Sequence, residues 1–361
     1  MSSSKCDTAP EPLDAVLVMS FGGPEQPAEV MPFLRRVTGG RVPDARLSLV
    51  ADHYLHFDGR SPINEQNRRL CEHLAAALAE RGFECPLALG NRFWHPLTAE
   101  AVEQLVGQGA RDIAVVATSG FASWPGCRAY QEDYEEVADR IPVGKRPRFR
   151  KVRLWYNHPV FLDCWGDRVV EAIGAPADIG PASSETPFLV FTTHSLPWQM
   201  AQDSGVAGTA YVAQHRFVAD RVARRAAGVL GRSFDWELSF QSQSGGGSGQ
   251  PWLTPTIDDT LRDLAARGVG RVVVAPIGFV TDHMEVMWDL GVEARQMATD
   301  LGLEFTLART IGDDPRFVSM LAELVLERSG GAMSSDRPAE GPDGPWPDEC
   351  PTGCCQSGKS T

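Results

Sequence analysis

The sequence predicts an α/β protein of two similar doubly wound domains, each built on a parallel four-stranded sheet. Short β-branched runs alternate with longer helical stretches along most of the 361 residues. The pattern occurs twice, before and after a stretch rich in Gly, Ala, Pro and Ser at 174–187. The expected strands are apolar throughout rather than at every second residue, which indicates parallel sheets covered by helices on both faces.

Each half contains four expected strands. The strands of the first half are expected at 14–20, 85–91, 112–120 and 148–156, and those of the second at 187–195, 235–243, 271–279 and 303–310. The clearest helix is 64–82, where apolar residues recur every three or four positions and Gly82 marks the end. This alternation of strands and helices is typical of Rossmann-like domains.

The two halves resemble each other in sequence. Residues 107–121 match 265–279 with a one-residue slip, and residues 18–24 align with 191–197, which places Phe21 opposite His194. Ligands of doubly wound sheets bind beyond the carboxyl ends of the strands. We therefore expect Phe21, the 119–130 loop, His194 and the 278–289 segment to face a cleft between the domains.

The organisation along the chain follows from these patterns. We expect an N-terminal extension at 1–12, α/β domains at 13–180 and 181–328, and a tail at 329–361 that ends in clustered cysteines. The tail is rich in Gly and Pro and lacks periodicity, a composition that predicts disorder unless the cysteines are tied down.

Charge and hydropathy exclude several partners. The net charge is −13 and the pI is near 5.1, which argues against nucleic acid or an anionic membrane surface. No apolar run approaches the roughly 20 residues of a membrane span, so stable membrane insertion is not expected. The first residues, "MSSSKCDTAPEPLDAV", lack a charged-then-apolar signal segment, and a cytoplasmic location is expected.

An acidic stripe follows an apolar strand in the second half. In "GFVTDHMEVMWDLGVE" (278–293), Glu285, Asp289 and Glu293 fall four residues apart, a spacing that slightly destabilises a helix. A capping box of Asp282 and Glu285 would explain only the first turn. A solvated helix face would explain the whole stripe, but the stripe begins where a buried strand opens into the expected cleft.

His194 follows the strand "FLVFTT" at the same expected cleft. A lone histidine after a strand is more often structural than catalytic. A histidine that meets a carboxylate across a cleft suits a divalent metal with N and O ligands. It equally suits proton abstraction. Large apolar side chains in expected loops would suit a flat, apolar ligand: Phe21, Phe121, Trp124, Trp198, Met200 and Trp252.

Four motifs resemble those of the ferrochelatase family, whose members insert ferrous iron into a porphyrin. They are "SFGGPE" (20–25), "THSLP" (193–197), "QPWLTPT" (250–256) and "PIGFVTDHMEVMWDLGVE" (276–293), and the resemblance runs from about residue 14 to 328. The last motif is the most specific. The resemblance implies a chelatase-like fold in which the porphyrin lies between two similar α/β domains.

The resemblance also implies roles for the acidic stripe. His194 and Glu285 would bind the substrate Fe²⁺ and carry the catalysis on one face of the porphyrin. His283, Asp289 and Glu293 would form a path for metal or protons. Functional helices of this kind often contain a π-bulge, which we expect near 285–290.

Porphyrin contacts follow from the same resemblance. Ser61 and Tyr130 match positions that contact the carboxylate side of the porphyrin, and Tyr54 and His53 are weaker matches. Phe21 would face the other side of the ring. Some relatives carry a tyrosine there that can ligate the product iron, which a phenylalanine cannot do.

The cysteines match a subset of the family that holds a [2Fe–2S] cluster. By this resemblance the ligands would be Cys164 together with Cys350, Cys354 and Cys355. Four thiolates suffice for such a cluster. A zinc site made from the same four thiols, or a free tail, would also be consistent with the sequence.

The resemblance favours coproporphyrin III as the substrate, with protoporphyrin IX as the alternative, and it allows other haem-pathway enzymes as partners. A porphyrin or haem carrier without catalysis is a second hypothesis, although a carrier needs no acidic path. A cobalt or nickel chelatase is a third, but such enzymes tend to use paired histidines, and only His194 is well placed here.

Overall fold

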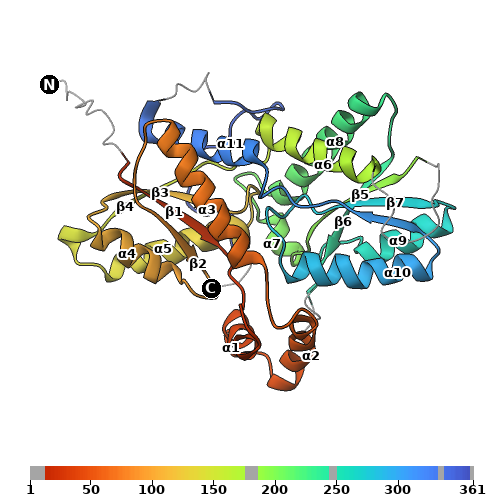
Figure 1. The fold of residues 1–361 in the computed structure, drawn as a ribbon, viewed down its shortest axis with the longest axis horizontal. Helices are drawn as coiled ribbons and strands as arrows, with labels where there is room; N and C mark the ends of the chain where they lie inside the picture. The colour runs from red at the N-terminus through yellow and green to blue at the C-terminus, as the bar shows by residue number, and fades with distance from the viewer. Residues whose placement is uncertain (1–12, 175–185, 244–249, 332–336, 358–361) are drawn as a thin grey trace.

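The computed structural model describes residues 13–174, 186–243, 250–331 and 337–357. It contains two parallel four-stranded sheets of the same strand order, β2-β1-β3-β4 and β6-β5-β7-β8 (Figure 1). Every strand lies within its predicted range, so the predicted fold of two similar α/β domains is confirmed. The strands are β1 Ala15–Ser20, β2 Leu87–Asn91, β3 Asp112–Ala117, β4 Arg148–Lys151, β5 Phe188–His194, β6 Trp236–Gln241, β7 Arg271–Ala275 and β8 Glu304–Leu307.

Helices connect the strands and cover the sheets. They are α1 Pro27–Val37, α2 Asp44–Leu55, α3 Ile63–Glu80, α4 Thr98–Gly107, α5 Ala129–Arg140, α6 Pro159–Gly174, α7 Trp198–Gln202, α8 Ala210–Leu230, α9 Ile257–Ala266, α10 Arg295–Asp300 and α11 Pro315–Leu326. Three π-helical segments are η1 Trp124–Arg128, η3 Glu285–Ala294 and η4 Glu327–Gly331, and η2 Val143–Lys145 is a 3₁₀ turn. Within the described ranges, no helix has the length and apolar character that crossing a membrane requires.

The strands form because their side chains are buried on both faces. In β1, Leu17 packs with α4 on one side of the sheet, and Val18 packs with α3 on the other. β5 repeats this division, with Val190 on the α9 side and Phe191 in the large core that runs between the two sheets. Burial on both faces is the reason that these strands show no polar alternation.

The two domains are interlocked by helices. α6 packs against α8 and approaches β7 and β8 of the second sheet, while α11 packs against α3 and β3 of the first. The largest apolar core therefore contains residues from both halves of the chain. This shared core fixes the position of the carboxyl end of β1 relative to that of β5.

A helical hairpin of α1 and α2 projects from the two sheets, at the bottom of Figure 1. Its apolar face, including Phe33 and Tyr54, packs with Met284 just before η3. Residues from both domains thus meet beside the carboxyl ends of the strands.

Two glycines allow close approaches at this edge. Gly278 donates its N–H to Thr192 O, and a Cβ at Gly278 would collide with the Thr193 side chain. The segment leading to η3 is thereby held against the end of β5, which carries His194. Gly22 has φ +82°, a left-handed conformation that glycine adopts readily, and it follows Phe21 directly.

Residues 337–357 of the tail pack on the body. The guanidinium of Arg153 donates to Pro338 O at 3.0 Å and to Glu327 at 2.7 Å, and Arg153 is 1% exposed. Asn157 Nδ2 donates to the carbonyls of Glu340 and Gly344. These polar contacts anchor the tail independently of its cysteines.

Candidate active site and cysteine site

His194 and Glu285 meet at the carboxyl end of the second sheet, as the motifs predicted. His194 ends β5, and its Nε2 lies 3.4 Å from Oε1 of Glu285, the first residue of η3. The other carboxylate oxygen of Glu285, Oε2, lies 3.3 Å from His283 Nδ1. The side chains of His194 and Glu285 are each 31% exposed, so a ligand can reach the pair.

The orientation of the His194 ring is fixed by its neighbours. Nδ1 donates to Ser195 O, which directs Nε2 toward Glu285. The hydroxyl of Tyr211 donates to His194 O at 2.9 Å and exchanges a hydrogen bond of 2.7 Å with the Thr193 hydroxyl. Gln241 Nε2 donates to Glu285 O at 2.7 Å and so holds the other member of the pair. Both members of the pair are thus held through their own backbone carbonyls.

The electrostatics of the pair favour opposite charges. Burial lowers the pKa of His194, but the adjacent Glu285 carboxylate outweighs burial and raises that pKa to about 9. Burial raises the pKa of Glu285, whereas His194 and His283 reverse this and bring it to about 2. Burial lowers the pKa of His283. The site therefore contains a charged histidine–carboxylate pair beside a neutral imidazole.

Asp289 continues the acidic stripe one turn further along η3. The Ser242 hydroxyl donates to its carboxylate, and Ser242 has φ 62°, a left-handed conformation that is uncommon for serine. Burial, together with the charges of Glu285 and Glu293, raises the pKa of Asp289 to about 7. The acidic stripe thus places Glu285, which stays ionised, one turn before Asp289, which gains and loses a proton near neutral pH.

This raised pKa predicts how stability depends on pH. A carboxyl group whose pKa is higher in the folded than in the unfolded chain makes the folded state lose stability as pH rises between the two pKa values. Asp289→Asn removes this cost. We expect it to stabilise the protein by about 1–2 kcal/mol at pH 8, roughly 2–8 °C in melting temperature, and by only about a third as much at pH 5, early in this pH window.

Thermal denaturation of both proteins at pH 5 and pH 8 measures this difference. Asp300→Asn, at an exposed position of α10, is the matched control for the loss of a carboxylate. An effect of Asp289→Asn that is equal at the two pH values would contradict the assignment of the proton to Asp289.

The expected π-bulge is present. η3 is π-helical over Glu285–Ala294, and it includes the expected region 285–290. The capping-box interpretation of Asp282 and Glu285 is wrong. η3 has no side-chain cap, and the Asp282 carboxylate accepts hydrogen bonds from Gln66 and Thr310 instead. The Glu285 side chain is consequently free to face His194 and His283.

An apolar wall lies beside the acidic stripe. Phe21, directly after β1, packs against Phe93 with tilted rings whose centroids lie 4.7 Å apart, and it belongs to one cluster with Tyr54 and Met284. Tyr54 is 7% exposed, and burial, followed by the charges of Glu285 and Asp289, raises the pKa of its hydroxyl. The structure thus brings these two predicted residues together near Glu285.

Tyr130 and Ser61 are both buried hydroxyl-bearing residues of the first domain. Tyr130 in α5 is 6% exposed, and the pKa of its hydroxyl is raised by burial, with smaller effects from Arg92 and Glu285. Ser61, also 6% exposed, lies against Gly23, where an added Cβ would be only 2.7 Å from the Ser61 Cβ. His53 stacks on Trp288 with ring centroids 4.1 Å apart.

Several residues of the site were not predicted from the sequence. Trp288, which stacks on His53, was passed over although it lies within the acidic motif. Gln241 ends β6 and Ser242 follows it, and their position at a carboxyl strand end was an available signal. Arg92, at the end of β2, lies 3.5 Å from Asp133 and 5.0 Å from the Trp124 ring, and it is a cation close to Tyr130.

A second cluster of reactive side chains surrounds the cysteines of the tail. Lys151 Nζ lies 2.9 Å from Cys127 Sγ and 3.8 Å from Cys350 Sγ. The sulfurs of Cys354 and Cys355 lie 3.7 Å apart. Cys355 has φ 55°, a conformation that lets two consecutive cysteines present their sulfurs together. Cys350 is hydrogen-bonded to Cys127 and to Cys354, so it links the sulfur beside Lys151 to the Cys354–Cys355 pair.

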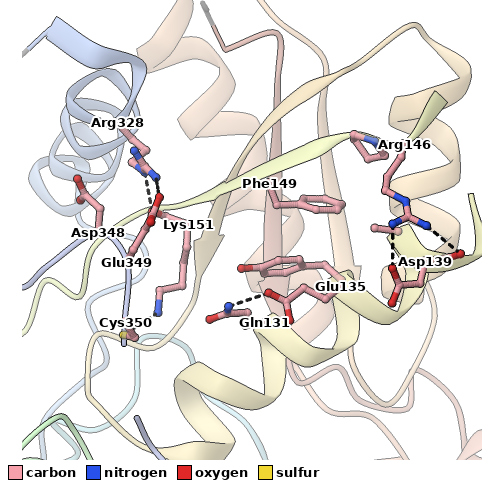
Figure 2. A pocket seen from close by; sticks show the side chains of 13 residues that line it. Gln131, Glu135, Asp139, Arg146, Phe149, Lys151, Arg328, Asp348, Glu349 and Cys350 are labelled. Atoms are coloured by element: carbon pink, nitrogen blue, oxygen red, sulfur yellow. Dashed lines mark hydrogen bonds and ion pairs between the residues drawn. The ribbon is translucent and has the colours of Figure 1, made fainter. Parts of the chain in front are cut away.

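The environment favours thiolates at two of these sulfurs. Hydrogen bonding to Cys127 lowers the pKa of Cys350, and hydrogen bonding to Cys354 lowers that of Cys355, whereas hydrogen bonding to Cys350 raises the pKa of Cys127 and of Cys354. Burial lowers the pKa of Lys151, but Cys127 and Cys350 reverse this and raise it, so the buried ammonium keeps its charge. The Gly205 N–H donates to Cys355 Sγ at 3.1 Å. Figure 2 shows Lys151 and Cys350 together at one side of a hollow of about 420 Å³, whose opposite side carries the Arg146–Asp139 ion pair. The cysteine site is therefore reached from solvent through this hollow.

Cys164, the predicted ligand from the body, lies inside α6 and is fully buried. It belongs to the same apolar core as Cys354 and Cys355, and the charged groups that act on it include Asp314, Arg316 and Asp167. Burial raises the pKa of Cys164 to about 12, which keeps it as a thiol. The body cysteine that meets the tail is Cys127, at the start of the segment that leads into Tyr130.

Among the residues that the structure describes, no three His, Cys, Asp or Glu side chains are grouped to hold a metal ion. The four sulfurs form a chain instead, in which Cys350 hydrogen-bonds with Cys127 and Cys354, and Cys354 lies 3.7 Å from Cys355.

Comparisons with known proteins find similar sequences over nearly the whole chain. A family model described as ferrochelatase matches residues 13–329. A protein of Streptomyces griseus named coproporphyrin III ferrochelatase is 43% identical over 357 residues, which cover 96% of this chain and 94% of that protein. A protein of the same name from Nocardia farcinica is 42% identical, with coverage of 95% and 96%.

Solved structures support the fold alone. The structure described as SirB from Bacillus subtilis with Fe³⁺ has a TM-score of 0.50 to this chain at 14% sequence identity. The similarity covers 88% of this chain and 96% of that one. The two-domain α/β architecture is thus shared with a protein of very different sequence.

Proposed function

The chain belongs to the ferrochelatase family, and from this premise we propose that it inserts ferrous iron into coproporphyrin III through His194 and Glu285. The family makes it a metal-chelating enzyme rather than a carrier. The observation that carries the assignment of the site is the His194–Glu285 pair, 3.4 Å apart and accessible at the carboxyl ends of the strands. Relatives over nearly the whole chain bear the name of the coproporphyrin III enzyme, which supports the choice of porphyrin.

The site chemistry suits the reaction. Iron insertion removes two pyrrole protons from the porphyrin and places Fe²⁺ on its nitrogens. Imidazole and carboxylate groups are ligands that Fe²⁺ accepts, and either can serve as a general base. His194 must be neutral to bind iron or take a proton, so the proton that Glu285 stabilises on it has to leave first. The reaction thus needs a route for protons away from this pair.

We propose that the acidic stripe provides this route. His283 contacts Glu285, and Asp289 and Glu293 extend away from it along η3. Asp289, with a pKa raised to about 7, can accept a proton near neutral pH and release it. The same carboxylates attract Fe²⁺ as it approaches. This use compensates for the cost of burying like charges in one helix.

The porphyrin contacts are proposed from the same geometry. Phe21 and Tyr54 offer an apolar surface next to Glu285, as a flat macrocycle requires. Ser61 and Tyr130 offer hydroxyl groups, and Arg92 adds a positive charge near Tyr130. Coproporphyrin III carries more carboxylate groups than protoporphyrin IX, so a polar, cationic edge of the site favours it.

We propose that the second site holds a [2Fe–2S] cluster on Cys127, Cys350, Cys354 and Cys355. The contacts of Cys127 and Cys350 with the Lys151 ammonium, the 3.7 Å between the sulfurs of Cys354 and Cys355, and the backbone N–H that donates to Cys355 support this donor set. When bound, such a cluster can carry one electron, and it would join the tail to the body. None of its ligands belongs to the His194–Glu285 pair, so iron insertion itself does not need them.

One assay tests the proposed function. Purified protein is mixed with coproporphyrin III or protoporphyrin IX and with Fe²⁺, Co²⁺, Ni²⁺ or Zn²⁺, and the formation of each metalloporphyrin is followed by absorbance. We expect the highest kcat/KM with coproporphyrin III and Fe²⁺, by at least about tenfold over protoporphyrin IX, equal to ~1.4 kcal/mol. Faster turnover of protoporphyrin IX would contradict the proposed substrate, and porphyrin binding without insertion would favour the carrier hypothesis.

A further inference from the structure

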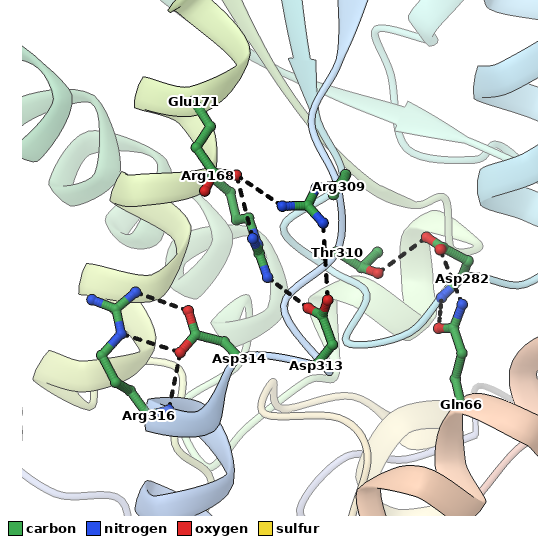
Figure 3. A network of polar contacts seen from close by, with 9 residues as sticks. All are labelled: Gln66, Arg168, Glu171, Asp282, Arg309, Thr310, Asp313, Asp314 and Arg316. Carbon is green, nitrogen blue, oxygen red and sulfur yellow. Dashed lines mark hydrogen bonds and ion pairs between the residues drawn. The ribbon is translucent and has the colours of Figure 1, made fainter. Parts of the chain in front are cut away.

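A hydrogen-bonded clasp joins the two domains directly ahead of the acidic helix. Gln66, in the first turn of α3, accepts the Asp282 N–H at 2.8 Å through Oε1. Its Nε2 donates to Asp282 Oδ2 at 3.1 Å. The amide of Gln66 thus satisfies both the backbone and the side chain of one residue in the other domain, as Figure 3 shows.

The other carboxylate oxygen of Asp282 is held from the opposite side. The Thr310 hydroxyl donates to Asp282 Oδ1 at 3.1 Å. Thr310 lies in the turn after β8, where the Gly312 N–H donates to Val280 O at 2.8 Å. Arg168 of α6 donates to Asp313 in the same turn at 2.6 Å (Figure 3). Asp282 is therefore fixed between α3 and a turn that is itself anchored to α6.

The start of α3 also holds the opposite wall of the proposed porphyrin site. Asn64 Nδ2 donates to Gly23 O at 2.9 Å, and Asn67 Nδ2 donates to the Ser20 hydroxyl at 2.8 Å. These two contacts flank Phe21. One helix end therefore sets the place of Phe21 and, through Gln66, the place of the turn that carries Glu285.

We propose that Gln66 is a positioning residue, which fixes Glu285 relative to the Phe21 wall through Asp282. Only two residues separate Asp282 from Glu285, and the Glu285 side chain must meet both His194 and the bound substrate. This inference rests on the proposed function. A shift of about 1 Å in a reacting group can cost about a hundredfold in rate, so a clasp on this turn acts on turnover more than on binding.

Gln66→Leu tests the clasp because it keeps a similar volume and removes both hydrogen bonds. We expect kcat for iron insertion to fall about tenfold to a hundredfold, while KM for the porphyrin stays within about threefold. The matched control is Gln296→Leu, whose amide donates to Asp300 within one helical segment and does not cross between domains. Gln66→Leu with wild-type kcat would overturn the proposal, as would an equal loss in the control.

Gln66→Glu should give a pH dependence of kcat that loss of packing alone would not produce. The new carboxylate can still accept the Asp282 N–H, but it repels the Asp282 carboxylate unless it binds a proton. Charged neighbours of this position are Arg69 and His73 of α3, and Arg309 and Asp313 of the turn after β8. We expect the ratio of mutant to wild-type kcat to rise as pH falls from 8 to 6. A ratio that is independent of pH would overturn the clasp.

A Glu285→Gln variant, assayed alongside, separates the two claims. If the proposed function is right and the clasp is wrong, Glu285→Gln loses activity while Gln66→Leu does not. If Glu285→Gln keeps full activity, the proposed function of the pair fails, whatever Gln66 does.

Discussion

His194→Ala should abolish iron insertion and leave the affinity for coproporphyrin within about tenfold of wild type, or ~1.4 kcal/mol. The ring of His194 faces Glu285 across 3.4 Å at the end of β5, and we propose that it acts on metal and protons there rather than on the periphery of the porphyrin. Loss of a general base costs about 10²–10⁴ in rate, and loss of a metal ligand adds to this. An insertion assay and a porphyrin fluorescence titration, performed on the same preparation, measure the two effects separately.

Glu285→Gln is the companion of this substitution. The glutamine keeps the shape of the side chain but cannot hold the proton on His194, whose pKa Glu285 raises to about 9. We expect most of the activity to be lost with the fold intact. His95→Ala changes an exposed histidine and serves as the control for His194→Ala. His215→Ala would be a poor control, because that ring is fully buried and stacks on Phe121. Wild-type turnover in His194→Ala would remove His194 from the mechanism.

The fold followed from the sequence because its strands are buried on both faces. A continuous apolar run such as β7 Arg271–Ala275 has few alternatives to a central parallel strand. The predicted strands ran several residues too far at their carboxyl ends, as at 112–120 against Asp112–Ala117. The excess residues of this run, Thr118, Ser119 and Gly120, are small and uncharged, so periodicity alone does not mark where the strand ends.

The site was predictable only where a motif stood next to a strand end. Glu285 belongs to the most specific motif, and His194 belongs to "THSLP", which would be weak alone; the structure brings the two residues together. Gln66 gave no such signal, because its partner Asp282 lies 216 residues further along the chain. Cys127 was missed for a related reason. A π-helical turn, η1, and the return of the tail across the body bring it to Cys350, and neither feature is visible in local sequence.

Cys127→Ser should bleach the protein, and Cys164→Ser should not. The purified wild type is expected to be red-brown, with roughly two iron and two sulfide per chain, as one Cys₄-ligated [2Fe–2S] centre implies. Cys127 lies 2.9 Å from the same Lys151 ammonium that Cys350 approaches, whereas Cys164 is enclosed in α6 with Asp314 as a neighbour. Absorbance together with iron and sulfide analysis of the two serine variants therefore decides between the two ligand sets.

Stability gives an independent measure of the same site. Without its fourth ligand the cluster should not assemble, and loss of a structural metal centre destabilises a fold. The melting temperature of Cys127→Ser should fall by roughly 2–4 °C for every kcal/mol lost. The tail should nevertheless stay partly docked, because Arg153 and Asn157 hold it through Pro338, Glu340 and Gly344.

Cys350→Ser, Cys354→Ser and Cys355→Ser should reproduce the bleaching of Cys127→Ser, since each removes one sulfur from the same group. Cys71→Ser and Cys85→Ser should keep the colour, because burial raises the pKa of these thiols to about 12 and about 11 and holds them protonated in the apolar core. Each variant should retain the His194–Glu285 chemistry when assayed at a temperature below its own melting point. A colourless wild type that contains zinc after anaerobic expression with ample iron would show that the four thiols select a different metal. Bleaching by Cys164→Ser with colour kept in Cys127→Ser would return the ligand role to α6.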